Sequence, residues 1–153
     1  MGGHGNPFRV PILGPVVDTN ILARGLLRPA GPRAALLAAA EEASFRLVLS
    51  PSILRELRKV FFKPHVRQRY PLTMDQIAEY MTSLQAVAEM VEGRLQVYGA
   101  SRDPADNHIL ACGLEGKVDF IVSDDRKHIL PLGEYRGIPI LSMPAFLRML
   151  RWR

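Results

Sequence analysis

The stretch Val-Val-Asp-Thr-Asn-Ile at residues 16–21 decides the expected fold, because an apolar run ends there at an acidic residue. The run predicts a short buried strand over residues 15–18, and the apolar residues from Ile21 onward have the spacing of a helix that begins near Asn20. Asp18 therefore lies where a strand turns into a helix. A polar side chain at such a junction often does no more than cap the helix, and Asn20 is the expected N-cap.

Outward from this stretch, short apolar runs alternate with segments of helical character. The runs are continuous rather than alternating, as expected for parallel strands that helices cover on both faces. The alternation of strands and helices predicts a three-layer α/β/α fold with a mainly parallel central sheet. Strands are predicted at residues 45–50, 94–98, 120–123 and 138–141, and helices at residues 33–43, 51–63, 73–91 and 104–114, with a short helix after each of the last two strands.

Length and composition limit the class of protein. The 153 residues suit one domain, expected over residues 15–153 after a flexible leader at residues 1–14 that is rich in glycine and proline. The net charge of +5 favours polyanionic partners, and no apolar stretch is long enough for a membrane span. Cys112 is the only cysteine, which excludes an internal disulfide and a cysteine-based zinc site and suits a reducing cytoplasm.

Three further acidic residues occupy positions comparable to that of Asp18. Glu56 lies within the third predicted helix, Asp106 one turn into the helix that begins at residue 104, and Asp125 directly after the run Phe-Ile-Val-Ser. In a parallel sheet, the segments at the carboxyl ends of the strands meet in one crevice. Several carboxylates that meet there repel one another, and a divalent cation is the simplest group that would hold them together.

Each acidic residue also has a purely structural interpretation. Asp106 could favour the N-terminus of its own helix, where negative charge is stabilised. Glu56 is harder to explain in this way, since it borders the apolar face of its helix. Of the neighbouring pair Asp124 and Asp125, one is expected to cap a helix and the other to point into the crevice; Asp125 is favoured for the crevice because Asp124 can face solvent.

The order of these segments and their amino-acid sequences resemble those of the PIN domain family. The likeness rests on Val-Val-Asp-Thr-Asn-Ile, Ser-Pro-Ser-Ile-Leu-Arg-Glu-Leu, Asp-Pro-Ala-Asp-Asn-His-Ile-Leu-Ala and Phe-Ile-Val-Ser-Asp-Asp, and it extends from Val16 to Leu141. It is closest to the compact bacterial and archaeal members that include the toxins of toxin–antitoxin pairs. The resemblance implies a cytoplasmic ribonuclease that depends on Mg²⁺ or Mn²⁺ and a small antitoxin protein as a partner.

The resemblance also implies which residues form the site. The catalytic residues and metal ligands would be Asp18, Glu56, Asp106 and Asp125, with Asn20 and Asp103 nearby. Ser123 stands where the family usually has threonine and keeps the hydroxyl group. Asp124 stands where the family often has glycine, arginine or asparagine, which leaves the fourth ligand open between Asp124 and Asp125.

A basic segment follows Glu56 and suggests where RNA binds. Residues 55–69 are strongly basic, and most such runs are solvated helix faces, but this run directly follows a site acid and is therefore also a candidate to guide a phosphate backbone toward the metals. Apolar segments near Phe61, Phe62 and Tyr70, and the tail at residues 146–152, are candidate surfaces for an antitoxin or a homodimer seam, or parts of the core. The residues expected to bind RNA are Arg55, Arg58, Lys59 and Lys63.

Two other functions compete with a ribonuclease. A phosphotransfer protein would use Asp18 as the nucleophile, but such a protein usually has a second aspartate where this chain has Asn20. A non-catalytic, PIN-like RNA-binding module would have lost its metal. The presence of all four acidic residues argues against that module.

Overall fold

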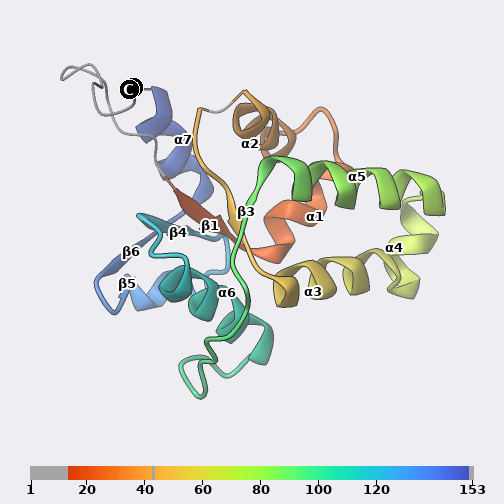
Figure 1. Cartoon of the computed structure of the whole chain (residues 1–153). Helices are drawn as coiled ribbons and strands as arrows, with labels where there is room; N and C mark the ends of the chain where they lie inside the picture. Colours follow the sequence, from red (N-terminus) through yellow and green to blue (C-terminus); the bar gives the residue numbers. More distant parts are fainter. Residues whose placement is uncertain (1–13, 43, 152–153) are drawn as a thin grey trace.

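The computed structural model describes residues 14–42 and 44–151, and these form an α/β structure around one sheet (Figure 1). In the described residues the sheet has the strand order β3-β2-β1-β4-β6-β5, with Val16 in the centre opposite Val48 and Ile121. Pairing is parallel except between β5 and β6. The strands are β1 (Pro15–Val17), β2 (Val48–Leu49), β3 (Glu89–Met90), β4 (Phe120–Val122), β5 (Glu134–Tyr135) and β6 (Ile138–Leu141).

Helices lie on both faces of the sheet. Gly113 lets a helix approach Ile121 closely, since a Cβ atom there would lie 3.3 Å from the Ile121 side chain. Phe146 of another helix packs edge-on against Phe45 and lies beside Phe120. Because neighbouring residues of a strand point to opposite faces, these two helices cover opposite faces. The helices are α1 (Thr19–Leu27), α2 (Pro32–Glu41), α3 (Pro51–Phe61), α4 (Pro64–Arg69), α5 (Met74–Val87), α6 (Pro104–Glu115) and α7 (Met143–Arg151), with a 3₁₀ turn at Leu130–Leu132.

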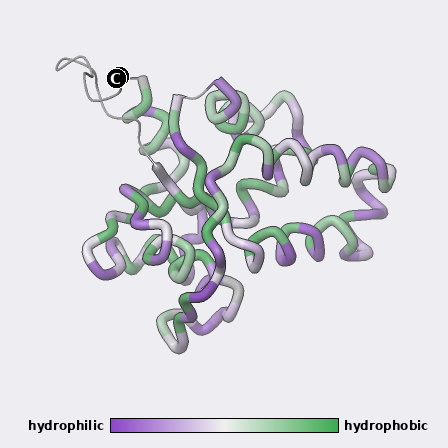
Figure 2. The backbone as a smooth tube through the Cα atoms, viewed as in Figure 1, coloured by the Kyte–Doolittle hydropathy of each residue, from purple (hydrophilic) through white to green (hydrophobic). Residues whose placement is uncertain are grey.

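The core follows the central strands, and a helical arm extends beyond them. Val16, Val48 and Ile121 are fully buried. Figure 2 shows apolar residues concentrated along the central strands and polar and apolar stretches alternating along α3 and α5. Helices α3, α4 and α5 extend away from the sheet in Figure 1. Helix α3 joins this arm to the sheet layer, since it contacts α1, α5 and α6.

The predicted three-layer fold with a mainly parallel sheet is confirmed, and several local signals are confirmed with it. Ser50 caps α3 by accepting a hydrogen bond from the Ile53 N–H, with Pro51 as the first helical residue. Thr73 and Gln76 form the capping box at the start of α5. None of the described helices is long and apolar enough to cross a membrane.

Several predicted elements are wrong. Residues 94–98 are not a strand: β3 is Glu89–Met90, within the predicted long helix, and the chain from residue 91 to residue 98 is irregular. The carboxylate of Glu115 explains this difference. It accepts hydrogen bonds from the N–H groups of Gly93, Arg94 and Leu95 at 3.0–3.3 Å, so these groups are satisfied without a strand partner. The helix expected after β4 is a turn followed by the 3₁₀ turn, and the β5–β6 hairpin was not predicted.

The start of the described chain is tied to the sheet. Residues 1–13 of the expected leader lie outside the described residues. Gly14, the last residue of that leader, is buried, and its N–H donates to the Asp119 carboxylate at 2.8 Å. Its carbonyl accepts from the Asp119 N–H at 2.9 Å. Gly14 therefore belongs to the packed structure.

We expect Glu115→Gln to loosen residues 93–95, because the neutral amide offers one oxygen and no charge to three N–H groups. Hydrogen exchange at Gly93, Arg94 and Leu95 should become faster, and Gln85→Ala on α5 serves as the control.

The hydrogen bonds that Glu115 accepts, that from Leu95 above all, hold the pKa of its carboxyl below the ordinary value of 4.5. The carboxylate therefore stabilises the wild type fully above about pH 4.5, and this contribution is lost as pH falls through the lower folded pKa. Equal exchange in variant and wild type at pH 7 would contradict this role.

Candidate active site

Asp18 occupies the point where the strand order of the sheet reverses. The chain passes from β1 outward to β2 and β3 and then returns to β4 on the other side of β1. In open α/β sheets, the crevice at the carboxyl ends of two such strands is the usual ligand site. The N–H of Asp18 donates to the Val122 carbonyl at 3.0 Å, so the ends of β1 and β4 are joined directly at this crevice.

The Asp18 side chain is buried and hydrogen-bonded at both oxygens. Oδ1 accepts the Ile21 N–H at 3.0 Å and Oδ2 accepts the Ser123 hydroxyl. Asp18, and not Asn20 as predicted, is therefore the N-cap of α1, because the helix begins at Thr19. With 6% of its surface exposed, Asp18 is poorly solvated, and this burial raises the pKa of its carboxyl against the opposing effect of the two hydrogen bonds.

Helices α3 and α6 supply the next two acidic residues. Glu56 of α3 is 28% exposed, and the Lys59 ammonium lies 3.4 Å from its Oε1. The Lys59 side chain is 71% exposed and nevertheless contacts this site acid. Asp106 lies in the first turn of α6 and accepts the Ser101 hydroxyl at 3.0 Å. Burial raises the pKa of Asp106, and the nearby charges of Asp103 and Asp125 raise it further.

The two acidic residues after β4 have different environments. Asp124 pairs with the Arg33 guanidinium at 3.0 Å and accepts the Met143 N–H at the start of α7. It is 25% exposed, so it faces solvent only in part. Asp125 caps the following turn by accepting the N–H groups of residues 127 and 128. The Ser123 hydroxyl contacts the Asp18 carboxylate and accepts the Asp125 N–H, and so links both acidic residues.

One cavity is lined by all four predicted acidic residues. It has a volume of about 160 Å³, and Asp18, Glu56, Asp106 and Asp125 all line it together with Asn20 and Asp103. Ser123 and Asp124 do not line it. Within residues 14–42 and 44–151, no three His, Cys, Asp or Glu side chains are grouped closely enough to hold a metal ion as they stand. The carboxylates thus surround a shared cavity without converging on one point.

Two basic cavities flank the acidic cavity. The first, of about 400 Å³, shares Asp18, Asn20 and Asp125 with it. The second, of about 250 Å³, shares Asn20 and Val60 with it. Sequence analysis missed most of the cations of these cavities, because they are single residues in separate segments, whereas His65 and Arg69 belong to the basic segment at residues 55–69. The first cavity is lined by Arg24, Arg33, Arg126 and Lys127, and the second by Arg24, Arg28, His65 and Arg69.

The four residues predicted to bind RNA do not lie together. Lys63 lines the acidic cavity, and Lys59 contacts Glu56 as described above. The guanidinium of Arg58 lies over the Phe62 ring at 5.5 Å from its centroid. Arg55 donates to the Ser52 hydroxyl at 3.0 Å and lines a different cavity. Only Lys63 therefore borders the cavity that holds the acidic residues.

The sequence matches the PIN domain family over residues 15–127. This match covers most of the chain, from the start of β1 to just beyond Asp125, and the chain belongs to this family. PIN domains are generally nucleases, and the chain therefore has a nuclease fold. A comparison with curated proteins gives no match.

Proposed function

We propose that this protein is a divalent-metal-dependent ribonuclease that hydrolyses RNA phosphodiesters. The observation that supports this proposal most directly is the acidic cavity between two basic ones. Carboxylates alone would repel RNA, and cations alone would bind it without cleaving it. An acidic centre with basic flanks suits a site that places a phosphodiester beside a bound cation.

The donor atoms of the acidic cavity fit a hard divalent cation. They are carboxylate oxygens and the Asn20 amide, and oxygen ligands are those that Mg²⁺ and Mn²⁺ prefer. The raised pKa values of Asp18 and Asp106 show that negative charge is costly there, so a cation would be favourable. Asp18, Glu56, Asp106 and Asp125 would hold it. A bound cation would activate a water molecule and stabilise the charge that develops on the phosphate.

The residues around the cavity would orient both the carboxylates and the RNA. Ser123 fixes the Asp18 carboxylate, and Asp124 is occupied by Arg33, which supports Asp125 over Asp124 as the fourth ligand. Arg24 lines both basic cavities, so it is placed to contact phosphates on either side of the acidic residues. We therefore assign the main phosphate contacts to Arg24, Arg28, Arg69, Arg126 and Lys127, with Lys63 at the acidic cavity.

The sequence around Asp18 argues against the phosphotransfer alternative. Such a protein usually has a second aspartate two residues after the nucleophile, but Asn20 stands there and lines the acidic cavity with Asp18. The non-catalytic alternative keeps the basic cavities but assigns no role to the four carboxylates that line the acidic cavity.

We expect Asp18→Asn to reduce Mg²⁺- or Mn²⁺-dependent RNA cleavage by at least about a hundred-fold, since the variant loses the central ligand charge. Its melting temperature should stay equal or rise, because a carboxylate whose pKa is raised by burial destabilises the fold when ionised. Asp75→Asn, in the first turn of α5, is the matched control and should cleave normally.

Three outcomes of this experiment would contradict the proposal. Cleavage by the wild type in excess chelator would exclude metal dependence. RNA binding without cleavage in saturating Mn²⁺ would favour the non-catalytic module. Transfer of labelled phosphate to wild-type protein, but not to the Asp18→Asn variant, would favour phosphotransfer.

The placement of the phosphate contacts can be tested through salt dependence. Arg24→Gln should weaken RNA binding and reduce the slope of log affinity against log salt by roughly 0.7, the value for one lost phosphate contact on a single strand. Arg58→Gln is the matched control, because the Arg58 guanidinium lies over the Phe62 ring. Binding in metal-free buffer, measured from 50 to 200 mM salt, separates the two. An unchanged slope for Arg24→Gln together with a reduced slope for Arg58→Gln would show that the phosphate contacts are made by α3 instead.

We further propose that the enzyme is the toxin of a toxin–antitoxin pair. Of the expected docking surfaces, Phe61 and Phe146 are buried in the core, and Trp152 lies outside the described residues. An apolar cavity of about 320 Å³ lies between α1 and the segment after α4, and it shares Leu27 and Tyr70 with the second basic cavity. This cavity suits an antitoxin segment that also places an arginine among the site carboxylates.

Expression of the protein alone should arrest growth, and co-expression of the neighbouring gene should restore it. Normal growth of cells that contain active enzyme would refute the toxin role.

A further inference from the structure

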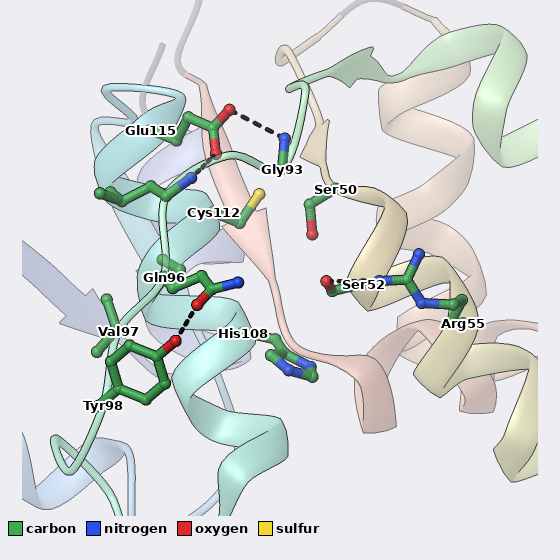
Figure 3. A pocket seen from close by; sticks show the side chains of 12 residues that line it. Ser50, Ser52, Arg55, Gly93, Gln96, Val97, Tyr98, His108, Cys112 and Glu115 are labelled. Atoms are coloured by element: carbon green, nitrogen blue, oxygen red, sulfur yellow. Dashed lines mark hydrogen bonds between the residues drawn. The ribbon is translucent and has the colours of Figure 1, made fainter.

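A cavity of about 320 Å³ lies outside the acidic and basic cavities, between α3, α6 and the irregular segment at residues 93–98 (Figure 3). None of the predicted acidic residues lines it. Its lining is largely polar, and the residues used below are Ser52, Arg55, Gln96, Tyr98 and His108.

The wall of this cavity is held in place by specific contacts. Glu115 fixes the start of the 93–98 segment to α6 through three backbone N–H groups. Gly93 has a φ of +82°, and a Cβ atom there would lie 3.3 Å from the Pro51 ring at the start of α3. The segment therefore needs glycine at this position to pass so close to α3. These contacts hold the 93–98 segment against α6 and α3 and so define the cavity wall.

Polar groups face the cavity, and donors predominate among them. The Gln96 Oε1 accepts the Tyr98 hydroxyl, which leaves the Gln96 amide nitrogen on the cavity side in Figure 3. Ser52 accepts a hydrogen bond from Arg55, so its own hydroxyl hydrogen remains to be donated. The Nδ1 atom of His108 is buried and has no hydrogen-bond partner among the described residues. The His108 ring lines the cavity, but this nitrogen is enclosed by protein and does not open onto it.

An aromatic ring stands at the rim of the same cavity. The side chain of Tyr98 is 81% exposed and is fixed through its hydroxyl by Gln96. An exposed ring gains little from water, whereas stacking of a nucleic-acid base on such a ring contributes about 1–3 kcal/mol. A flat ligand with hydrogen-bond acceptors on its edge would use the ring and the donors together.

The cavity lies close to the proposed cleavage site along both helices. Ser52 precedes Glu56 by one turn of α3, a distance of about 6 Å along the helix axis. His108 follows Asp106 by two residues on α6. A strand of RNA held at the acidic residues would thus bring a neighbouring base within reach of this cavity.

We propose that this cavity is a nucleobase pocket that selects one base of the RNA beside the cleaved phosphate; this proposal rests on the ribonuclease function above. Tyr98 stacks on the base, and Gln96, Ser52 and His108 contact its edge. Because donors predominate, bases with carbonyl oxygens fit better than adenine, which has none. Guanine, uracil and cytosine, which each carry a carbonyl oxygen, are therefore preferred over adenine.

The first experiment requires no cleavage. Wild-type protein in metal-free buffer is titrated with GMP, UMP, AMP and ribose 5-phosphate, and binding is followed by NMR at the Gln96 side-chain amide and the Tyr98 ring. We expect GMP or UMP to shift both signals and to bind roughly five-fold or more tighter than AMP, the discrimination that about 1 kcal/mol provides. Gln96→Ala should abolish this preference, whereas Gln85→Ala, an exposed amide on α5, should keep it.

Several results of the titration would contradict the proposal that this cavity binds a nucleobase. Equal shifts with ribose 5-phosphate would show that the cavity recognises phosphate and not a base. Equal affinity for all nucleotides, or no shift at either residue, would contradict base selection. A preference for AMP would contradict the role of the donors.

The second experiment separates the pocket from the nuclease proposal. Cleavage of a random RNA pool in Mn²⁺ should show a preferred base at one position beside the cut. Tyr98→Ala and Gln96→Ala should lose that preference, whereas Gln85→Ala, outside the pocket, should keep both the preference and the total cleavage rate. Nucleotide binding without any cleavage by the wild type would support the pocket and refute the nuclease. Cleavage with unchanged base preference in both variants would refute the pocket alone.

Discussion

The rest of the site depends on the contact between Ser123 and Asp18, which lies where the sheet reverses its strand order. The Asp18 N–H bonds to the Val122 carbonyl, so the backbone already joins the ends of β1 and β4 at this point. The Ser123 hydroxyl then ties the two side-chain positions together, because it contacts the Asp18 carboxylate and accepts the Asp125 N–H. Two acidic residues about a hundred positions apart in the sequence are held at one crevice by this serine.

Holding acidic residues together at this crevice brings their negative charges close to one another. Burial of Asp18 and crowding around Asp106 raise both carboxyl pKa values, so the fold bears an electrostatic cost at this point. Nearby cations reduce this cost only in part: Arg33 is bound to Asp124, and Lys59 contacts Glu56 from a largely exposed position. A site that keeps such charges close together without a full set of paired cations is suited to a cationic ligand.

The sequence predicted those parts of the fold that depend on local signals. Ser50 with Pro51, and Thr73 with Gln76, start helices through contacts within a few residues, so their pattern is sufficient. The acidic residues were predicted to meet because strand ends in a parallel sheet share one edge, and they line one cavity. Residues 94–98 were misassigned because the side chain that satisfies part of this backbone, Glu115, is about twenty positions away. No local pattern reports such a partner.

Most of the cations near the site could not be found from the sequence for a related reason. The run at residues 55–69 is conspicuous, but a helix points its side chains in all directions, and only Lys63 of the predicted four faces the acidic cavity. Arg24 and Arg33 are isolated in the sequence and meet only because α1 and α2 pack together. Ser52 and Glu56 lie one turn apart on the same face of α3, and Glu56 lines the acidic cavity while Ser52 lines the cavity beside residues 93–98. Because α6 also lines both cavities, and its Glu115 holds the segment that carries Gln96 and Tyr98, the separation between the reacting phosphate and a selected base would be set by the packing of α3 against α6 and by this anchored segment.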